Sequence, residues 1–166
     1  MQLPDYLDAI LTLVRMKKNF PANMKLTEKQ IEEIADNLDC GMRCFYNIKT
    51  GEIKTIINFD SWIVADEEPW EEESKEIDEN WDDYFEFTGF ESHESFQLMV
   101  DYAESVDDKK LQNKLINVLS KPKPFQNFKW QIDNSGEYRQ QWFDFKKIRY
   151  IQWVKKQIDL NNKDFE

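Results

Sequence analysis

Two β-rich runs joined by a short turn set the tightest limit on how this chain can fold. The runs cover residues 42–48 and 52–58, and a Lys-Thr-Gly turn that ends at Gly51 separates them. This pattern is typical of an antiparallel β-hairpin, in which glycine can adopt the positive φ angle that a tight turn needs. Aromatic residues recur near residues 83–88 and predict a third strand. We therefore expect a small antiparallel sheet.

Apolar residues recur at helical spacing on both sides of the hairpin. Before the hairpin, stripes over about residues 5–18 and 28–38 predict two helices, and Thr27 with Gln30 forms a capping-box pattern at the start of the second. The last helix should cover about residues 136–160. Because its apolar residues spread around most of its circumference, we expect it to be the most buried helix.

Two more helices are predicted between the third strand and the last helix. Ser92 is a good N-cap for the first of them. Asp107 or Asp108 can cap the second, which Pro122 and Pro124 stop. A small antiparallel sheet, the hairpin of residues 42–58 and the third strand, packed on a mostly helical body is an α+β fold.

The length of 166 residues fits one domain, residues 1–166, with enough apolar bulk for a sizeable core. Residues 1–26 form an N-terminal helical extension in this interpretation. Residues 60–83 form an acidic segment whose degree of order the sequence leaves open. With only four Gly and five Pro in the chain, we find no flexible linker, and we find no internal repeat.

Charge is distributed unevenly along the chain, whose net charge is −11. Residues 1–106 hold 25 acidic and 9 basic side chains, a net of −16, whereas residues 107–166 hold 8 acidic and 13 basic ones, a net of +5. The acidity concentrates between Asp60 and Glu94, where 15 carboxylates occur with one lysine. A surface of this charge steers basic partners toward it and repels nucleic acid.

The two cysteines, Cys40 and Cys44, do not form a disulfide framework, and free thiols suggest a reducing compartment. The N-terminus has acidic residues before its apolar centre and basic residues after it, which is the wrong polarity for a secretory signal. No run approaches the length of a membrane span. We therefore expect a cytoplasmic protein that does not enter the membrane.

Five stretches of the chain resemble, in order and spacing, the Uncharacterised Protein Family 0158, a group of small acidic proteins found mainly in bacteria. The stretches are "YNIKTGEI", "DSWIVADEE", "DDYFEFTGFESHESFQLMVDYAESV", "LINVLSKPKPFQNFKWQI" and "QQWFDFKKIRYIQWVKKQI". The matching motif residues are Tyr46, Thr50, Gly51, Glu52, Ser92, His93, Glu94, Phe125, Phe128, Lys129, Trp142 and Phe145. The resemblance covers about residues 27–160, leaves the first 26 residues outside, and implies no activity.

His93 is the only histidine, so neither a two-histidine metal site nor a histidine-paired relay can form within one chain. At the start of a helix, the macrodipole favours a neutral imidazole, which suits a general base. One alternative is therefore a small, hydrolase-like enzyme that uses His93 with carboxylates such as Glu94, although a helix-start residue packed on the preceding strand is the simpler interpretation. The acidic run lacks the glycine-turned spacing of a calcium loop, and we expect no metal and no cofactor.

A second alternative is a nucleic-acid-associated protein that uses residues 121–129. Lys121, Lys123 and Lys129 could contact phosphates there, and the neighbouring aromatic residues could stack on bases. However, the net charge of −11 opposes approach to a polyanion, and we do not expect direct binding. Phe125 and Phe128 more simply form one helix face that anchors this segment to the core.

We favour a non-catalytic interaction or regulatory module, because the sequence lacks phosphate loops, nucleophile elbows and dinucleotide fingerprints. In this hypothesis, an acidic surface that also carries tryptophans binds another protein with a basic surface. A homo-oligomer is also open. The residues expected to form this surface are Trp62, Trp70, Glu71, Glu72, Glu73, Trp81, Asp82 and Asp83.

Overall fold

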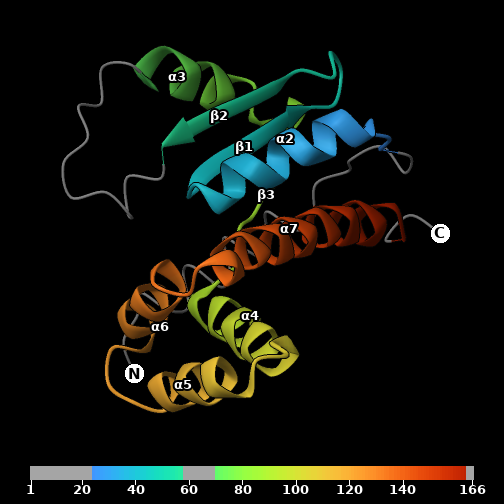
Figure 1. Ribbon diagram of the computed structural model, residues 1–166. Coiled ribbons are helices and arrows are strands. Elements are labelled where there is room, and N and C mark those ends of the chain that lie inside the picture. The colour runs from blue at the N-terminus through green and yellow to red at the C-terminus, as the bar shows by residue number, and fades with distance from the viewer. Residues whose placement is uncertain (1–23, 58–69, 164–166) are drawn as a thin grey trace, which may run out of the picture.

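The computed structural model describes residues 24–57 and 70–163 and has the predicted α+β fold (Figure 1). Its helices and strands are α2 (Glu28–Asp39), β1 (Met42–Asn47), β2 (Ile53–Ile57), α3 (Glu71–Glu79), the 3-10 turn η3 (Trp81–Asp83), β3 (Tyr84–Phe87), α4 (Ser92–Ser105), α5 (Lys109–Leu119), α6 (Pro124–Asp133) and α7 (Glu137–Lys163). The helix predicted near residues 5–18 and the part of the acidic segment over residues 60–69 lie outside the described residues.

The predicted hairpin and third strand form one antiparallel sheet with the order β2-β1-β3. In the register, Phe45 of β1 lies opposite Lys54 of β2 on one side and Glu86 of β3 on the other. The hairpin turn contains Gly51 with a φ of 75°, as expected. The side chain of Asn47 stabilises the turn by accepting hydrogen bonds from the backbone N–H groups of the two residues at its tip.

Both faces of the sheet are covered. Because successive side chains of a strand point to opposite faces, Cys44 and Tyr46 pack toward α2 and α7, while Phe45 packs toward α3. Figure 1 shows α2 and α3 on opposite sides of the sheet. The cover on the α3 side is thinner, because Ile77 is the buried residue of that helix. By contrast, α2 buries four residues, Ile31, Ile34, Ala35 and Leu38.

Helix α7 connects two cores. Its C-terminal half contributes Tyr150, Val154 and Ile158 to the core beneath the sheet, whereas its N-terminal half places Trp142 and Phe145 against the core of α4, α5 and α6. In Figure 1 the helix lies between the sheet layer and this smaller bundle.

The expectation that α7 is the most buried helix is wrong. Ile148 is 56% exposed and Leu160 is 52% exposed. The apolar residues spread around the helix because its two halves face different cores, so the buried stripe differs from one half to the other. At any one point along α7, only part of the circumference is covered.

Tyr102 lies at the centre of the second core. Its ring makes edge contacts with the rings of Phe128, Trp142 and Phe145, with centroid distances from 5.1 to 6.5 Å. Its hydroxyl donates a hydrogen bond of 2.7 Å to the backbone carbonyl of Tyr138 at the start of α7. Burial raises the pKa of Tyr102 to about 12. This contact ties α4 to the N-terminal half of α7.

The capping predictions are confirmed at α2 and α5 and corrected at α4. Thr27 and Gln30 form a reciprocal capping box, and Asp108 accepts hydrogen bonds from two backbone N–H groups of α5. At α4 the N-cap is Glu91 instead of Ser92. Glu91 has the extended backbone that an N-cap needs, and its side chain forms a capping box with Glu94, so Ser92 becomes the first helical residue.

The two cysteines are free thiols, and Cys40 is exposed while Cys44 is buried. The Sγ atom of Cys44 donates to the backbone carbonyl of Ile34 on α2. Burial, and then the nearby carboxylates of Glu33 and Glu86, raise the pKa of Cys44 to about 12. Because a thiolate is the nucleophilic form, the burial and raised pKa of Cys44 make it a poor nucleophile.

Candidate functional site

The carboxylates of α2 are neutralised by lysines of α7. Glu28 pairs with Lys155 at 2.9 Å, and Asp39 pairs with Lys146 at 2.6 Å. Between these two pairs, Lys147 lies 3.4 Å from Asp36 and 4.0 Å from Glu32. Four of the five carboxylates of α2 therefore face a cation of α7 across the helix interface. Three of the 13 basic side chains that the sequence places in residues 107–166 are thus used in this interface.

The carboxylates of helix α3 are mostly without such partners among the described residues. This helix carries six carboxylates and one lysine in nine residues, and four of these carboxylates have no ion-pair partner among the residues that the structure describes. Those four are Glu71, Glu72, Glu73 and Asp78. Glu71, Glu72 and Asp78 are exposed, and Glu73 is half-buried. We call Glu71, Glu72, Glu73 and Asp78 together the α3 acidic face.

One polar cluster holds α3 on the sheet beside its buried Ile77. Glu76 pairs with the ammonium of Lys54 on β2 and accepts a hydrogen bond of 3.1 Å from the hydroxyl of Tyr84 on β3. These two hydrogen bonds, that from Lys54 first, lower the pKa of Glu76, and the same contact with Glu76 raises the pKa of Lys54. The cluster fixes the inner side of the helix and leaves Glu71, Glu72 and Asp78 of the α3 acidic face exposed to solvent.

The tryptophans and aspartates expected near this face have different environments. Trp70 and Trp81 are half-buried and pack against the core between the sheet and α3, where the Trp81 ring meets Phe45 edge-on at 6.2 Å. Asp82 is exposed, and Asp83 pairs with Lys49 of the hairpin turn at 2.8 Å. Trp62 lies outside the described residues. Trp70 and Trp81 therefore border the α3 acidic face, and both side chains are only partly exposed.

His93 lies on the surface at the first turn of α4. Its side chain is 76% exposed, and its Nδ1 atom is 3.4 Å from a carboxylate oxygen of Glu91. Its neighbour Glu94 accepts a hydrogen bond of 2.9 Å from the backbone N–H of Glu91 through Oε2. His93 does not line the cleft described below, although Glu94 does. The described residues thus bring to His93 only the carboxylate of the adjoining turn.

The basic residues predicted as a patch surround the start of α6. Lys121 and Lys123 are exposed in the connection from α5, and Lys129 pairs with Asp133 one turn further along the helix at 2.7 Å. Phe128 is buried as expected, but Phe125 is 45% exposed and only touches the ring of Phe96 from the edge. The α6 surface also exposes Trp130, at 62%.

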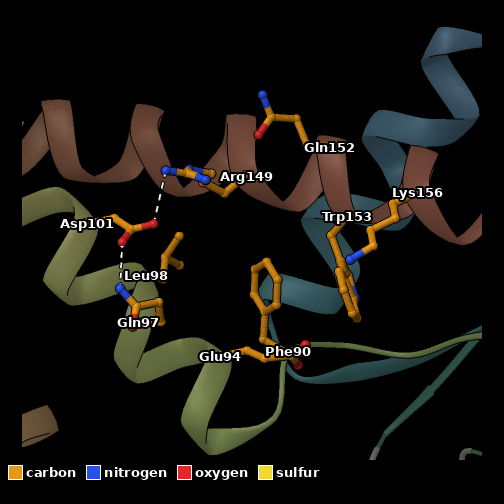
Figure 2. Close-up of a pocket in the computed structure, with 9 residues that line it drawn as sticks. All are labelled: Phe90, Glu94, Gln97, Leu98, Asp101, Arg149, Gln152, Trp153 and Lys156. Carbon is orange, nitrogen blue, oxygen red and sulfur yellow. Dashed lines mark hydrogen bonds and ion pairs between the residues drawn. The ribbon is translucent and has the colours of Figure 1, made fainter.

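A cleft of about 380 Å³ lies between α4 and α7 (Figure 2). Its lining residues come from three segments of the chain: the connection before α4, α4 itself and the middle of α7. They are Phe90, Glu94, Gln97, Leu98, Asp101, Arg149, Gln152, Trp153 and Lys156. The cleft sits where α7 passes from one core to the other.

Hydrogen bonds fix the two sides of this cleft. On one side, Asp101 accepts from Nε2 of Gln97 at 2.8 Å and from Nη2 of Arg149 at 3.1 Å, as the dashed lines of Figure 2 show. On the other side, the indole Nε1 of Trp153 donates to the backbone carbonyl of Thr88 at 2.7 Å. Side chains held in this way are pre-organised, because little conformational freedom remains to be lost when a ligand binds.

None of the sequence patterns described above predicts this cleft. The signal is the spacing of Arg149, Gln152, Trp153 and Lys156, which recur at i, i+3, i+4 and i+7 and therefore share one side of α7. In an exposed helix such a row is ordinary. It becomes a cleft wall only because α4 faces it, and that tertiary contact cannot be read from the row itself.

A family model described as Uncharacterised protein family (UPF0158) matches residues 22–165, which is most of the chain. The match begins before residue 27, so the shared region extends further toward the N-terminus than the motifs indicated. No curated protein and no solved structure matches the chain. Among the described residues, no helix is both long and apolar enough to cross a membrane.

Proposed function

The chain belongs to the Uncharacterised protein family (UPF0158), and we propose that it is a non-catalytic interaction module whose α3 acidic face binds a basic surface of another protein. One observation carries the proposal: Glu71, Glu72, Glu73 and Asp78 have no ion-pair partner among the described residues, whereas most carboxylates of α2 do. Unpaired carboxylates concentrated on one short helix attract a partner of opposite charge over a distance.

The surroundings of α3 support the same proposal. The contacts of Ile77 and Glu76 hold the helix against the sheet, so its outward carboxylates keep a fixed spacing. Trp70 and Trp81 lie half-buried at its two ends, and aromatic residues beside charges are common energetic centres of protein interfaces. A fixed acidic helix with aromatic borders suits recognition of a protein better than chemistry.

The enzyme alternative has less support. His93 was its best residue, and the side chain is exposed, with one carboxylate nearby and no place in the cleft lining. A general base needs a pocket that holds the reacting group within hydrogen-bond reach. We also propose that the interaction takes place in the bacterial cytoplasm, which free thiols and the family resemblance favour.

The test is affinity capture from a cell lysate with three forms of the full chain. They are the wild type, a triple variant Glu71→Gln, Glu72→Gln and Glu73→Gln, and a control with the same charge change, Glu33→Gln, Glu104→Gln and Asp159→Asn. The control residues are exposed carboxylates on α2, α4 and α7 without an ion pair among the described residues. We expect a basic protein that is captured in stoichiometric amount by the wild type and by the control.

The purified partner then allows a direct titration. We expect its dissociation constant to rise about tenfold in the α3 variant and its affinity to fall with added salt. Thermal stability should be unchanged, because the three side chains make no described ion pair. Equal loss of capture in both variants, a partner that is not basic, or capture of only a second copy of the chain would contradict the proposal.

A further inference from the structure

We propose that the cleft between α4 and α7 is a binding site for a small organic anion that carries a planar ring. This site is separate from the α3 acidic face, because its lining residues belong to other elements. Its volume of about 380 Å³ lies within the range of small-molecule sites, which extends from about 300 to 1,000 Å³.

Helix α7 presents a set of hydrogen-bond donors to the cleft. Lys156 has no ion-pair partner among the described residues, and Gln152 has no side-chain hydrogen bond among them. Arg149 uses one amino group for Asp101, and its guanidinium lies 5.0 Å from the ring centroid of Phe145, which orients the remaining donors. An ammonium, an amide and a guanidinium on one side of a helix can together bind a carboxylate or phosphate.

Three of the four carboxylate oxygens that α4 presents to the cleft already accept hydrogen bonds. Asp101 accepts from both Gln97 and Arg149, and one oxygen of Glu94 accepts from the backbone N–H of Glu91 in the capping box. A cationic ligand would have to compete with these contacts. An anionic ligand meets the ammonium of Lys156 and the amide of Gln152, which have no competing ion pair or hydrogen bond among the described residues, so the cleft favours an anion although its formal charges balance.

The rings of Phe90 and Trp153 form an aromatic wall of the cleft. The ring centroid of Phe90 lies 4.5 Å from that of Tyr150 and 5.3 Å from that of Trp153. The indole is held by its hydrogen bond to Thr88, whose backbone N–H donates to Gln157 one turn further along α7. The ammonium of Lys156 lies 5.4 Å from the centroid of the Trp153 ring. A planar ring can therefore stack in the cleft while its anionic group reaches Lys156.

The experiment uses the full chain and three probes: adenosine 5′-monophosphate, benzoate and inorganic phosphate. The first two join an anion to a planar ring, as a phosphate and as a carboxylate, and the third has no ring. Binding is followed through the indole N–H signal of Trp153 in two-dimensional NMR spectra, assigned with the variant Trp153→Phe. We expect one or both ring-bearing probes to shift this signal, with saturation at millimolar concentration or below.

Two lysine variants make the test specific. Lys156→Gln removes the cleft cation, and Lys114→Gln removes an exposed lysine of α5 that has no described ion pair. We expect the first to weaken binding about fivefold and the second to leave it unchanged. Neither change should affect folding, and the indole spectrum of each variant checks this directly.

Three outcomes would overturn the proposal. The Trp153 signal could stay in place with both ring-bearing probes up to about 10 mM, which is weaker than a specific site allows. The two lysine variants could lose affinity equally, which would mean that only overall charge matters. Inorganic phosphate could bind as tightly as the ring-bearing probes, which would leave the aromatic wall without a role.

Discussion

Helices α2 and α3 carry nearly the same numbers of acidic and basic residues but have different electrostatic surroundings. Helix α2 carries five carboxylates and one lysine, and α3 carries six carboxylates and one lysine. Four of the α2 carboxylates pair with Lys146, Lys147 and Lys155 of α7. On α3, only Glu76 and Glu79 have a described ion pair, and the partner of Glu79 is Lys75 of the same helix.

The difference follows from where each helix packs. Helix α2 lies along α7, which carries five lysines, and buries four apolar residues at that contact and against the sheet. Helix α3 lies on the opposite face of the sheet, where β2 offers Lys54 and the hairpin turn offers Lys49. Most carboxylates of α2 thus pair within the fold, while four of the six on α3 have no ion-pair partner among the described residues.

The largest effect that can test this comparison comes from the core beneath α2. Ile34 is fully buried there, and Ile34→Ala should lower the free energy of unfolding by about 3 kcal/mol, because it leaves a cavity between α2 and the sheet. Urea denaturation followed by circular dichroism measures the loss. The matched control is Ile148→Ala on α7, an exposed isoleucine, which should cost no more than about 0.5 kcal/mol. Similar losses in both variants would contradict the assigned core.

A smaller and more local effect is expected beneath α3. Ile77→Ala removes the buried residue of that helix and should weaken its attachment to the sheet by about 2 kcal/mol. Because few other contacts hold α3, the helix should open without the rest of the molecule. Hydrogen exchange should then show faster exchange of the α3 amides and unchanged exchange of the α2 amides. Equal acceleration in both helices would mean that α3 cannot detach separately.

The sequence predicts the elements better than it predicts their contacts. The hairpin, the third strand, the Thr27 capping box and the Asp108 cap follow from local patterns, and local hydrogen bonds decide them. Serine is a commoner N-cap than glutamate, so the sequence predicts an N-cap one residue too late, at Ser92. Glu91 is the N-cap of α4 because it forms a reciprocal capping box with Glu94. The burial of α7 was overestimated because periodicity counts apolar residues and does not show which partner covers each side.

The contacts of the candidate site are even harder to predict from the sequence. The uneven charge of the two halves is visible in the sequence, but it does not indicate that α2 uses the basic residues of α7 and that α3 does not. The cleft depends on Arg149 and Asp101, which are 48 residues apart and meet only after α4 packs on α7. Contacts of this kind depend on the folded arrangement, and the spacing of residues along the chain does not predict them.

A still smaller effect separates the ion pairs of the two helices. Lys146 is 19% exposed and pairs with Asp39, so Lys146→Gln should lower the free energy of unfolding by about 1 kcal/mol. The matched variant Lys75→Gln on α3 removes a lysine whose pair with Glu79 is exposed and 3.9 Å long, and it should change stability by less than about 0.3 kcal/mol. Thermal denaturation at low and high salt measures both. An equal effect of the two variants would remove the distinction between a stabilising interface and an available face.

The smallest effect concerns pH and Glu76. Its lowered pKa means that the folded state favours the carboxylate, so the stabilising contact is complete above the ordinary glutamate pKa and is lost as pH falls through the lowered one. The raised pKa of Lys54 sets the alkaline limit, because the contact is lost again as pH rises through it. We therefore expect Glu76→Gln to be less stable than the wild type at neutral pH and equal to it in acid, as measured by urea midpoints over a pH series. For Glu104→Gln, an exposed control, the difference should be small at every pH, and a similar pH dependence in both variants would mean that general charge, not the contact with Lys54, is responsible.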